Sequence, residues 1–122
     1  MPAVLIVDDD HDFRAILRTL FERGSGFDAC VEAENAAEAL QKTKQVSPKL
    51  AVLDSSLPEM NGLQLARELR AISPKLPIFL LIADCGAELE KEALGCGITA
   101  VFSKVDDLTT LVSNARAVCG IE

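Results

Sequence analysis

Short uninterrupted apolar runs alternate along the chain with longer amphipathic stretches. Four runs predict strands that are buried on both faces, at residues 3–7, 50–53, 78–83 and 99–102. A fifth segment, 27–33, sets apolar Phe27 and Val31 beside the acidic residues Asp28 and Glu32. This alternation predicts a strand at the edge of the sheet with one face in water. Five strands are therefore expected.

Each predicted strand is followed by a stretch with the apolar spacing of a helix. The first has its stripe at Phe13, Ile16, Leu17, Leu20 and Phe21 and ends near Gly24. The second opens at Asn35 and Glu38 with the spacing of a capping box, and the others are expected at 65–72, 89–94 and 108–118. Because strand and helix alternate five times, the right-handed crossover rule predicts an α/β fold, with a doubly wound parallel sheet covered by helices on both faces.

Ligand sites in such sheets lie beyond the carboxyl ends of the strands, where the crossovers change direction. The residues that follow the predicted strands are Asp8 and Asp9, then Asp54, then 82–84, and finally Ser103 and Lys104. Three carboxylates and one amine are therefore expected to converge at one edge of the sheet.

Three carboxylates at adjacent strand ends repel one another unless a hard cation lies between them. Mg²⁺ suits this set better than Ca²⁺, because it accepts a few carboxylates and leaves other positions to water or phosphate oxygens. A carboxylate beside Mg²⁺ and the ammonium of Lys104 can attack phosphorus and form an aspartyl phosphate. Asp10 and Asp12 are read as helix N-caps, and His11 as a solvated residue at the helix start.

Composition narrows the class of protein. The 122 residues are 49% hydrophobic and only 4% aromatic, which is typical of one globular domain with an aliphatic core. The net charge of −7 argues against direct binding of nucleic acid or anionic lipid. The longest apolar run, 76–83, is far shorter than the ~20 residues of a membrane span. Four dispersed cysteines, Cys30, Cys85, Cys96 and Cys119, indicate reduced thiols in a cytoplasmic protein.

Two longer motifs surround the acidic residues of the predicted site. The first is Val4-Leu5-Ile6-Val7-Asp8-Asp9-Asp10, and the second is Asp54-Ser55-Ser56-Leu57-Pro58-Glu59-Met60-Asn61-Gly62. The first resembles the first strand and acidic pair, and the second the phosphoacceptor segment, of the receiver domain of bacterial two-component response regulators, the CheY-like family. The resemblance extends over essentially the whole chain, so it implies one receiver domain at 1–122 with strand order 2-1-3-4-5, the order that is typical of CheY.

The resemblance also implies roles at matching positions. Asp54 would accept a phosphoryl group from a histidine kinase or phosphotransfer protein, and Lys104 would pair with it. Asp9 would bind Mg²⁺ directly, Asp8 through water, and Ser56 through its backbone carbonyl. Pro58 and Gly62 would shape the loop, proline by fixing φ and glycine by tolerating a positive φ. Such a domain is a signalling protein, with at most self-catalysed phosphorylation and dephosphorylation.

Three positions depart from the family pattern. Ile82 stands where Thr or Ser is typical, Val101 where an aromatic residue is typical, and Val105 where Pro follows the lysine. The hydroxyl that would bind the phosphoryl group is therefore absent at position 82. The coupling between this hydroxyl and an aromatic residue, typical of the family, is therefore not expected in its ordinary form, although Ile82 and Val101 can still pack as core residues.

A receiver fold and similar sheets also serve functions other than a phosphorelay. A phosphorylation-independent pseudo-receiver would act as a protein-interaction module. A flavin or nucleotide enzyme would need a glycine-rich or hydroxyl-rich phosphate loop after the first strand, where Asp8, Asp9 and Asp10 would repel phosphate. A phosphatase with two aspartates spaced by one residue is disfavoured, because Ser56 occupies the second position after Asp54. An output domain, a downstream protein or a homodimer is compatible with the sequence.

Overall fold

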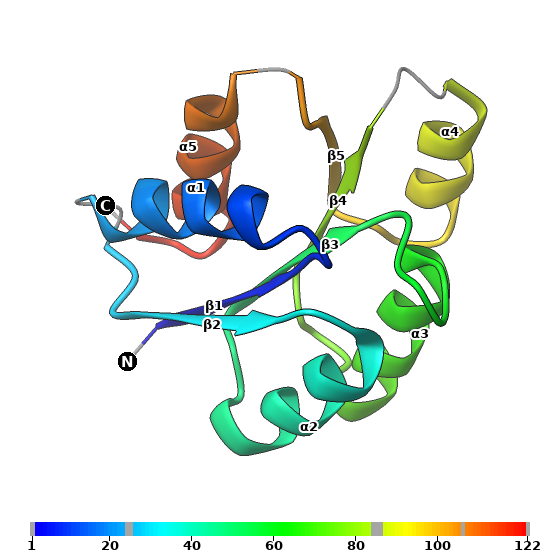
Figure 1. Cartoon of the computed structure of the whole chain (residues 1–122), viewed down its shortest axis with the longest axis horizontal. Helices are drawn as coiled ribbons and strands as arrows, with labels where there is room; N and C mark the ends of the chain where they lie inside the picture. The colour runs from blue at the N-terminus through cyan, green and yellow to red at the C-terminus, as the bar shows by residue number, and fades with distance from the viewer. Residues whose placement is uncertain (1, 24–25, 84–86, 106, 122) are drawn as a thin grey trace.

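The computed structural model describes residues 2–23, 26–83, 87–105 and 107–121. Strands and helices alternate in the order β1 (Ala3–Val7), α1 (His11–Glu22), β2 (Ala29–Ala33), α2 (Ala36–Val46), β3 (Leu50–Asp54), α3 (Gly62–Ile72), β4 (Ile78–Ile82), α4 (Ala87–Gly95), β5 (Ala100–Ser103) and α5 (Leu108–Val118) (Figure 1). Three residues named in the sequence analysis, Gly24, Asp84 and Cys85, lie outside the described residues. The predicted boundaries of the described elements agree with the observed ones to within a few residues.

The five strands form one parallel sheet in the order β2-β1-β3-β4-β5. The predicted α/β fold, with its strand order 2-1-3-4-5, is therefore confirmed. Both β1 and β3 are buried along their whole length and pair directly, with Val7 opposite Leu53. This pairing places the residues that follow β1 beside the end of β3.

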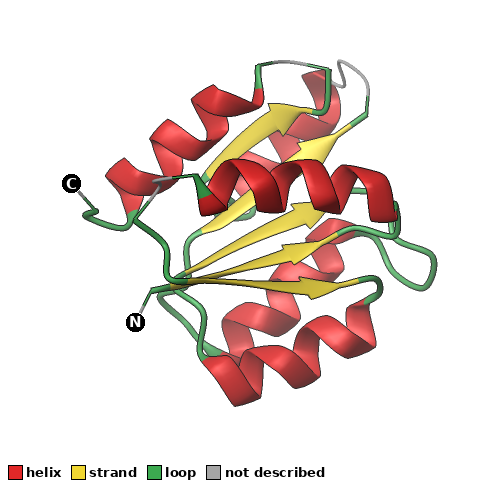
Figure 2. Cartoon of the chain, turned by 60° about the vertical axis from the view of Figure 1, so that its left-hand side comes forward, coloured by secondary structure: helices red, strands yellow, loops and turns green. Residues whose placement is uncertain are grey.

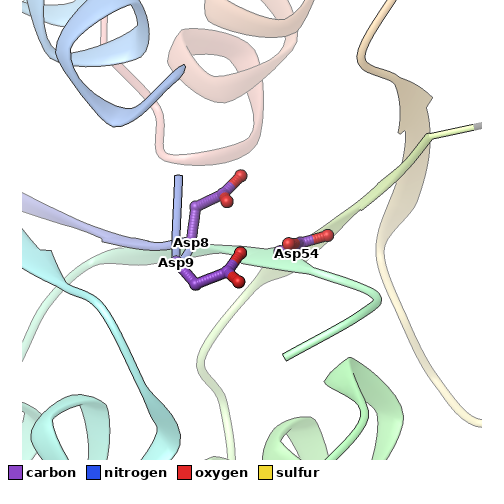
Figure 3. Close-up of side chains that lie close together, drawn as sticks. All are labelled: Asp8, Asp9 and Asp54. Atoms are coloured by element: carbon purple, nitrogen blue, oxygen red, sulfur yellow. The ribbon is translucent and has the colours of Figure 1, made fainter. Parts of the chain in front are cut away.

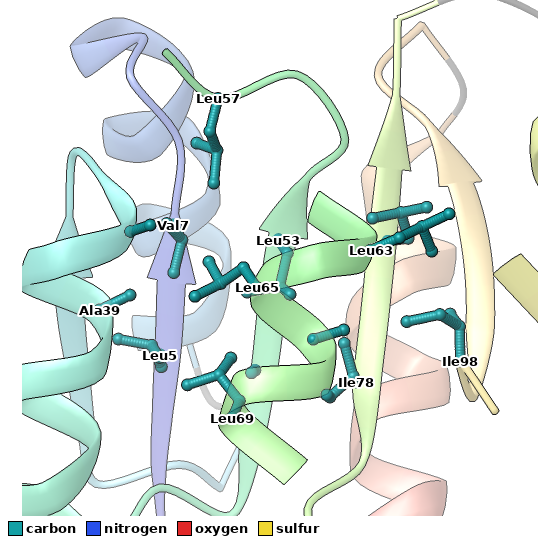
Figure 4. Packing of buried hydrophobic residues seen from close by; sticks show 14 of the residues in the cluster. Leu5, Val7, Ala39, Leu53, Leu57, Leu63, Leu65, Leu69, Ile78 and Ile98 are labelled. Carbon is teal, nitrogen blue, oxygen red and sulfur yellow. The ribbon is translucent and has the colours of Figure 1, made fainter. Parts of the chain in front are cut away.

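Helices cover both faces of the sheet (Figure 2). On one face α1 and α5 pack on a buried cluster that includes Leu17, Phe21 and Leu111. On the other face α2, α3 and α4 pack on a second cluster, part of which Figure 4 shows around Leu53, Leu65 and other aliphatic side chains. Burial of these branched side chains is the main force that holds the layers together.

The edge strand β2 differs from its sequence-based description. It begins at Ala29, so Phe27 precedes the strand and packs with the α1/α5 cluster, whereas Val31 packs on the opposite face. The face that carries Glu32 is covered by α1 rather than open to water. There Glu32 pairs with Arg14 at 3.2 Å and with Arg18 at 2.8 Å. The acidic residue was read as a solvated position because its partners lie on another element.

The residues that α1 buries also differ in part from those predicted. Ile16 was assigned to the apolar stripe, but 52% of it is exposed. Arg14 is instead buried, with 8% exposed, together with Leu17 and Phe21. The guanidinium satisfies buried polar partners that periodicity alone cannot reveal, so a charged residue takes a core position here.

Helix caps agree with the sequence in part. Asp10 is the N-cap of α1 and accepts hydrogen bonds from the backbone N–H groups of Asp12 and Phe13. The Asn35 side chain caps α2, but the Glu38 carboxylate accepts from Glu34 N rather than closing the reciprocal pair. The complete capping box lies at α3, where the side chains of Asn61 and Gln64 each accept from the other's backbone N–H. None of the described helices has the length and apolar character that spanning a membrane requires.

Candidate functional site

Three aspartates meet at the carboxyl edge of the sheet. Asp8 and Asp9 follow β1, and Asp54 is the last residue of β3. One carboxylate oxygen from each lies within 4.8 Å of the others. Figure 3 shows the three side chains together at this edge. The convergence expected from the strand ends is therefore present in the structure.

Asp8 is the most buried member of this group, with no exposed surface. Its Oδ1 accepts a hydrogen bond from Asp10 N at 2.9 Å, and its Oδ2 lies 2.7 Å from Lys104 Nζ. Burial raises the pKa of the Asp8 carboxyl, and the nearby Asp54 adds to this effect, while Lys104 and the Asp10 N–H act in the opposite direction. The net upward direction shows that the fold holds this carboxylate at an electrostatic cost.

Asp54 is also buried, with 4% exposed, and its carboxylate likewise has two partners. Its Oδ1 accepts a hydrogen bond from Ser56 N at 3.2 Å. Its Oδ2 lies 3.4 Å from Lys104 Nζ. One carboxylate oxygen therefore faces the following loop and the other faces the lysine.

Lys104 places its ammonium between two aspartates. Its backbone N–H donates to Ile82 O at the end of the sheet, and its Nζ lies 4.7 Å from the centre of the Phe13 ring. Burial lowers the pKa of Lys104, but the hydrogen bonds and charges of Asp8 and Asp54 outweigh it and raise the pKa above its usual value. The lysine was expected to pair with Asp54, and it does, but Asp8 is its closer partner.

The loop after Asp54 returns tightly to the start of α3. Ser55 N donates to Leu81 O, and Gly62 N donates to Ser55 O. A Cβ at Gly62 would lie 2.6 Å from Asp54 O and 2.7 Å from Leu80 Cδ1. The expectation that Gly62 is needed for a positive φ is wrong, since its φ is not positive. The glycine is needed because the helix start lies against the backbone of the site.

The donor set fits a hard divalent cation. Asp8, Asp9 and Asp54 offer carboxylate oxygens, and Asp9 is exposed while the other two are buried. Buried Asp8 Oδ2 has Lys104 as its one close partner among the described residues. The single ammonium balances one of three carboxylates, so a bound divalent cation would offset the remaining charge.

Two of the three positions that depart from the family pattern, Ile82 and Val101, lie on β4 and β5, and the third, Val105, follows β5. Ile82 is 5% exposed and belongs to the α2/α3/α4 core cluster, against which Val101 also packs. Val105 is 81% exposed. Ile82 and Val101 therefore pack as core residues, as the sequence analysis allowed.

The sequence did not predict that Phe13 and Arg14 lie near the site. Phe13 was assigned only to the core, yet its ring lies beside the Lys104 ammonium. Arg14 donates a hydrogen bond from Nη1 to Asp8 O at 2.6 Å. The sequence position of Arg14, between the apolar stripe residues Phe13 and Leu17, is compatible with a buried side chain. An exposed arginine can occupy the same kind of position, so the sequence did not identify this contact. The solvated helix-start reading of His11 agrees with its 81% exposed side chain.

Comparison with known proteins identifies the class. Residues 4–116 match the model of the response regulator receiver domain, so the chain belongs to this family. Receiver domains are the signalling domains of two-component response regulators, and phosphorylation on aspartate is their general function. As a class they bind Mg²⁺ at an acidic pocket and work with histidine kinases and output domains. They are not enzymes in the usual sense.

Individual relatives agree with this family. A putative transcriptional regulator of Pseudomonas aeruginosa is 37% identical over 97% of this chain and 56% of its own length. The chemotaxis protein CheY of Thermotoga maritima is 33% identical over 77% of this chain and 78% of its own length. The solved receiver domain of the Francisella response regulator 1452 has a TM-score of 0.88 at 26% identity, covering 98% of both chains. The chain thus spans about half the length of the Pseudomonas relative.

The three cysteines within the described residues, Cys30, Cys96 and Cys119, have free thiols. Burial raises the pKa of the Cys30 thiol to about 11, and burial also raises that of Cys119. These two thiols are therefore poor nucleophiles at neutral pH.

Proposed function

We propose that Asp54 is the phosphoacceptor of this receiver domain, in a Mg²⁺ site that it shares with Asp8 and Asp9. The observation that carries the proposal is the convergence of these three carboxylates within 4.8 Å, next to the Lys104 ammonium. In this proposal Asp9 is a direct ligand, Asp8 acts through water, and the backbone carbonyl of Ser56 completes the protein ligands.

An Asp54 carboxylate oxygen would act as the nucleophile. It forms a bond to phosphorus while the bond between phosphorus and the donor breaks, and the donor leaves with that electron pair. Lys104 Nζ, 3.4 Å from Asp54 Oδ2, is placed to stabilise negative charge on the transferred phosphoryl group. Mg²⁺, when bound, would supply further positive charge to the phosphoryl oxygens.

The donor in this proposal is a histidine kinase or a histidine phosphotransfer protein. Its phosphohistidine would meet Asp54 at the open side of the site, where Asp9 is exposed. Such donors obtain phosphate from ATP, so we assign the chain to the cytoplasm, where the thiols of Cys30, Cys96 and Cys119 would stay reduced. The domain would catalyse only its own phosphorylation and dephosphorylation.

A phosphorylation-independent pseudo-receiver is the second candidate. It is favoured by one observation, the apolar packing of Ile82 and Val101 at positions where the family typically couples phosphorylation to conformation. In this case the acidic site would be present without a role in signalling, and partner binding would be unchanged by Asp54→Ala.

The test is incubation with acetyl phosphate and Mg²⁺, followed by intact mass measurement. We expect wild type to gain one phosphoryl group, to lose this gain when EDTA replaces Mg²⁺, and Asp54→Asn to gain none. Asp12→Asn is the matched control, because Asp12 follows the same acidic cluster but its side chain is 98% exposed and outside the site. A wild-type protein that gains no phosphate would contradict the proposal and support the pseudo-receiver.

A further inference from the structure

Arg14 joins α1 to the backbone of the acidic site. It is 8% exposed, and its Nη1 donates to the carbonyl oxygen of Asp8 at 2.6 Å. A charged side chain is buried at a cost, which is offset only when its donors are satisfied. The hydrogen bond to the Asp8 carbonyl therefore helps to offset the cost of burying the Arg14 guanidinium.

The Asp8 carbonyl belongs to the same planar peptide unit as the N–H of Asp9. The direction of this plane decides where the Asp9 side chain points. On the other side of Asp8, its N–H is fixed by Ala33 O at 3.1 Å. The Asp9 side chain is exposed and has no hydrogen bond or ion pair within the described residues, so the backbone sets its position toward Asp54.

Arg14 is in turn held by the edge strand. Its Nε lies 3.2 Å from Glu32 Oε1, and the other oxygen of Glu32 accepts from Arg18 Nη1 at 2.8 Å. Burial raises the pKa of the Glu32 carboxyl, but the hydrogen bonds from Arg18 and Arg14 outweigh it and hold the pKa below its usual value. The carboxylate thus remains ionised and keeps the Arg14 guanidinium aimed at the Asp8 carbonyl.

We propose that Arg14 is a positioning residue that orients the Asp8–Asp9 peptide and thereby presents Asp9 as a metal ligand, with Glu32 holding Arg14 in place. This inference rests on the proposed metal site. Groups that orient a ligand through a hydrogen bond typically change metal affinity by about 10- to 100-fold when they are removed.

The sign of the effect separates positioning from simple electrostatics. Removal of a cation near three carboxylates should, by charge alone, strengthen the binding of a divalent metal. Loss of orientation should weaken it. Arg14→Met is therefore expected to lower Mn²⁺ affinity by about tenfold, opposite to the electrostatic direction.

The experiment is titration of the whole chain with Mn²⁺, with free Mn²⁺ measured by electron paramagnetic resonance and Mg²⁺ added as competitor. Arg18→Met is the matched control, because Arg18 is on the same helix and binds the same Glu32 but does not contact Asp8. We expect Arg18→Met to stay within about twofold of wild type and Arg14→Lys to regain part of the loss. Circular dichroism and urea unfolding establish that each variant is folded.

Glu32→Gln tests the inference even if Arg14→Met does not fold. It keeps the shape of the side chain but removes the charge that holds Arg14, so a severalfold loss of Mn²⁺ affinity is expected. Unchanged or tighter Mn²⁺ binding by folded Arg14→Met, or an equal loss in Arg18→Met, would overturn the role of Arg14. That result would leave the proposed function intact, whereas failure of wild type to bind Mn²⁺ would overturn both.

Discussion

The carboxyl ends of β1 and β3 differ in chemistry from those of β4 and β5, although all four lie at the same edge of the sheet. The first pair of strands leads into Asp8, Asp9 and Asp54. The second pair ends in Ile82, inside the core, and Ser103, followed by Lys104. Three acids thus gather on one half of the edge, and the other half contributes one cation and apolar packing.

In the proposed function, this difference separates the carboxylates that take part in phosphorylation from the positions at which the family typically transmits a signal. The acidic half supplies the three carboxylates of the proposed site, at an electrostatic cost seen in the raised pKa of buried Asp8. The β4/β5 half gains ordinary packing from Ile82 and Val101 but has no hydroxyl at position 82. Phosphorylation should therefore be sensitive to changes at the three acids and at Lys104, and tolerant of changes at Ile82 and Val101.

Among the changes that leave Asp54 in place, the largest effect is expected from Lys104→Met. Removal of the ammonium 3.4 Å from Asp54 Oδ2 should slow phosphorylation by acetyl phosphate about 100-fold, because a preorganised charge at the transferred group is lost. The initial rate of mass gain measures this. Lys75→Met, at an exposed site away from the acids, is the control. A rate within a few fold of wild type would show that Lys104 has no part in the chemistry.

A smaller effect, on stability alone, is expected from Ile82→Thr. Loss of a buried methyl group and burial of a hydroxyl should lower the free energy of unfolding by about 2 kcal/mol. Phosphorylation of the folded variant should stay within a few fold of wild type, since Ile82 is not among the acids or the lysine. Urea unfolding and mass gain give the two values. A folded variant that no longer accepts phosphate would abolish the distinction between the halves.

Asp8→Asn should stabilise the metal-free protein by about 1 kcal/mol at neutral pH, because it removes a buried carboxylate whose ionised form the fold disfavours. The pKa of Asp8 in the folded protein is raised above its usual value of 3.8. The protonated carboxyl therefore favours the folded state, and this contribution is complete below pH 3.8 and is lost as the pH rises through the folded pKa. The advantage of the variant over wild type should accordingly grow from pH 3 to pH 7.

Urea unfolding across this pH range, with and without Mg²⁺, tests the sign. Added Mg²⁺ should stabilise wild type more than Asp8→Asn, since the variant has lost one charge of the site. An advantage of the variant that shrinks as pH rises would contradict the account of Asp8.

The smallest effect is expected from Phe13→Leu. The ring lies 4.7 Å from Lys104 Nζ, and loss of a partly exposed cation–π contact should slow phosphorylation about two- to fivefold. Phe13→Tyr keeps an aromatic face and should retain the wild-type rate. Equal rates for Phe13→Leu and wild type would limit Phe13 to a packing role.

The sequence predicted the fold well because buried parallel strands leave continuous apolar runs. The run at Ala3–Val7 agrees with β1, and the strand order that the family resemblance implied agrees with the sheet. The edge strand was described less well, since Glu32 looks solvated until Arg14 and Arg18 of α1 are placed over it. Ion pairs between distant elements leave no periodic trace in a sequence.

The site was predictable where one residue follows one strand, as for Asp54 and Lys104. It was not predictable where a contact depends on how the helix is rotated, as for Arg14. The need for glycine at position 62 was expected, but its reason was wrong, because close approach to Asp54 O rather than a positive φ excludes a side chain. Residue type alone does not distinguish these two reasons.

The most direct test of the central claim is the position of the phosphoryl group. The protein is incubated with acetyl phosphate and Mg²⁺, the acyl phosphate is reduced with borohydride, and the modified residue is located by peptide sequencing in a mass spectrometer. We expect modification at Asp54 alone, and none in the Asp54→Asn variant. Modification at Asp8 or Asp9 instead, or its persistence in Asp54→Asn, would contradict it.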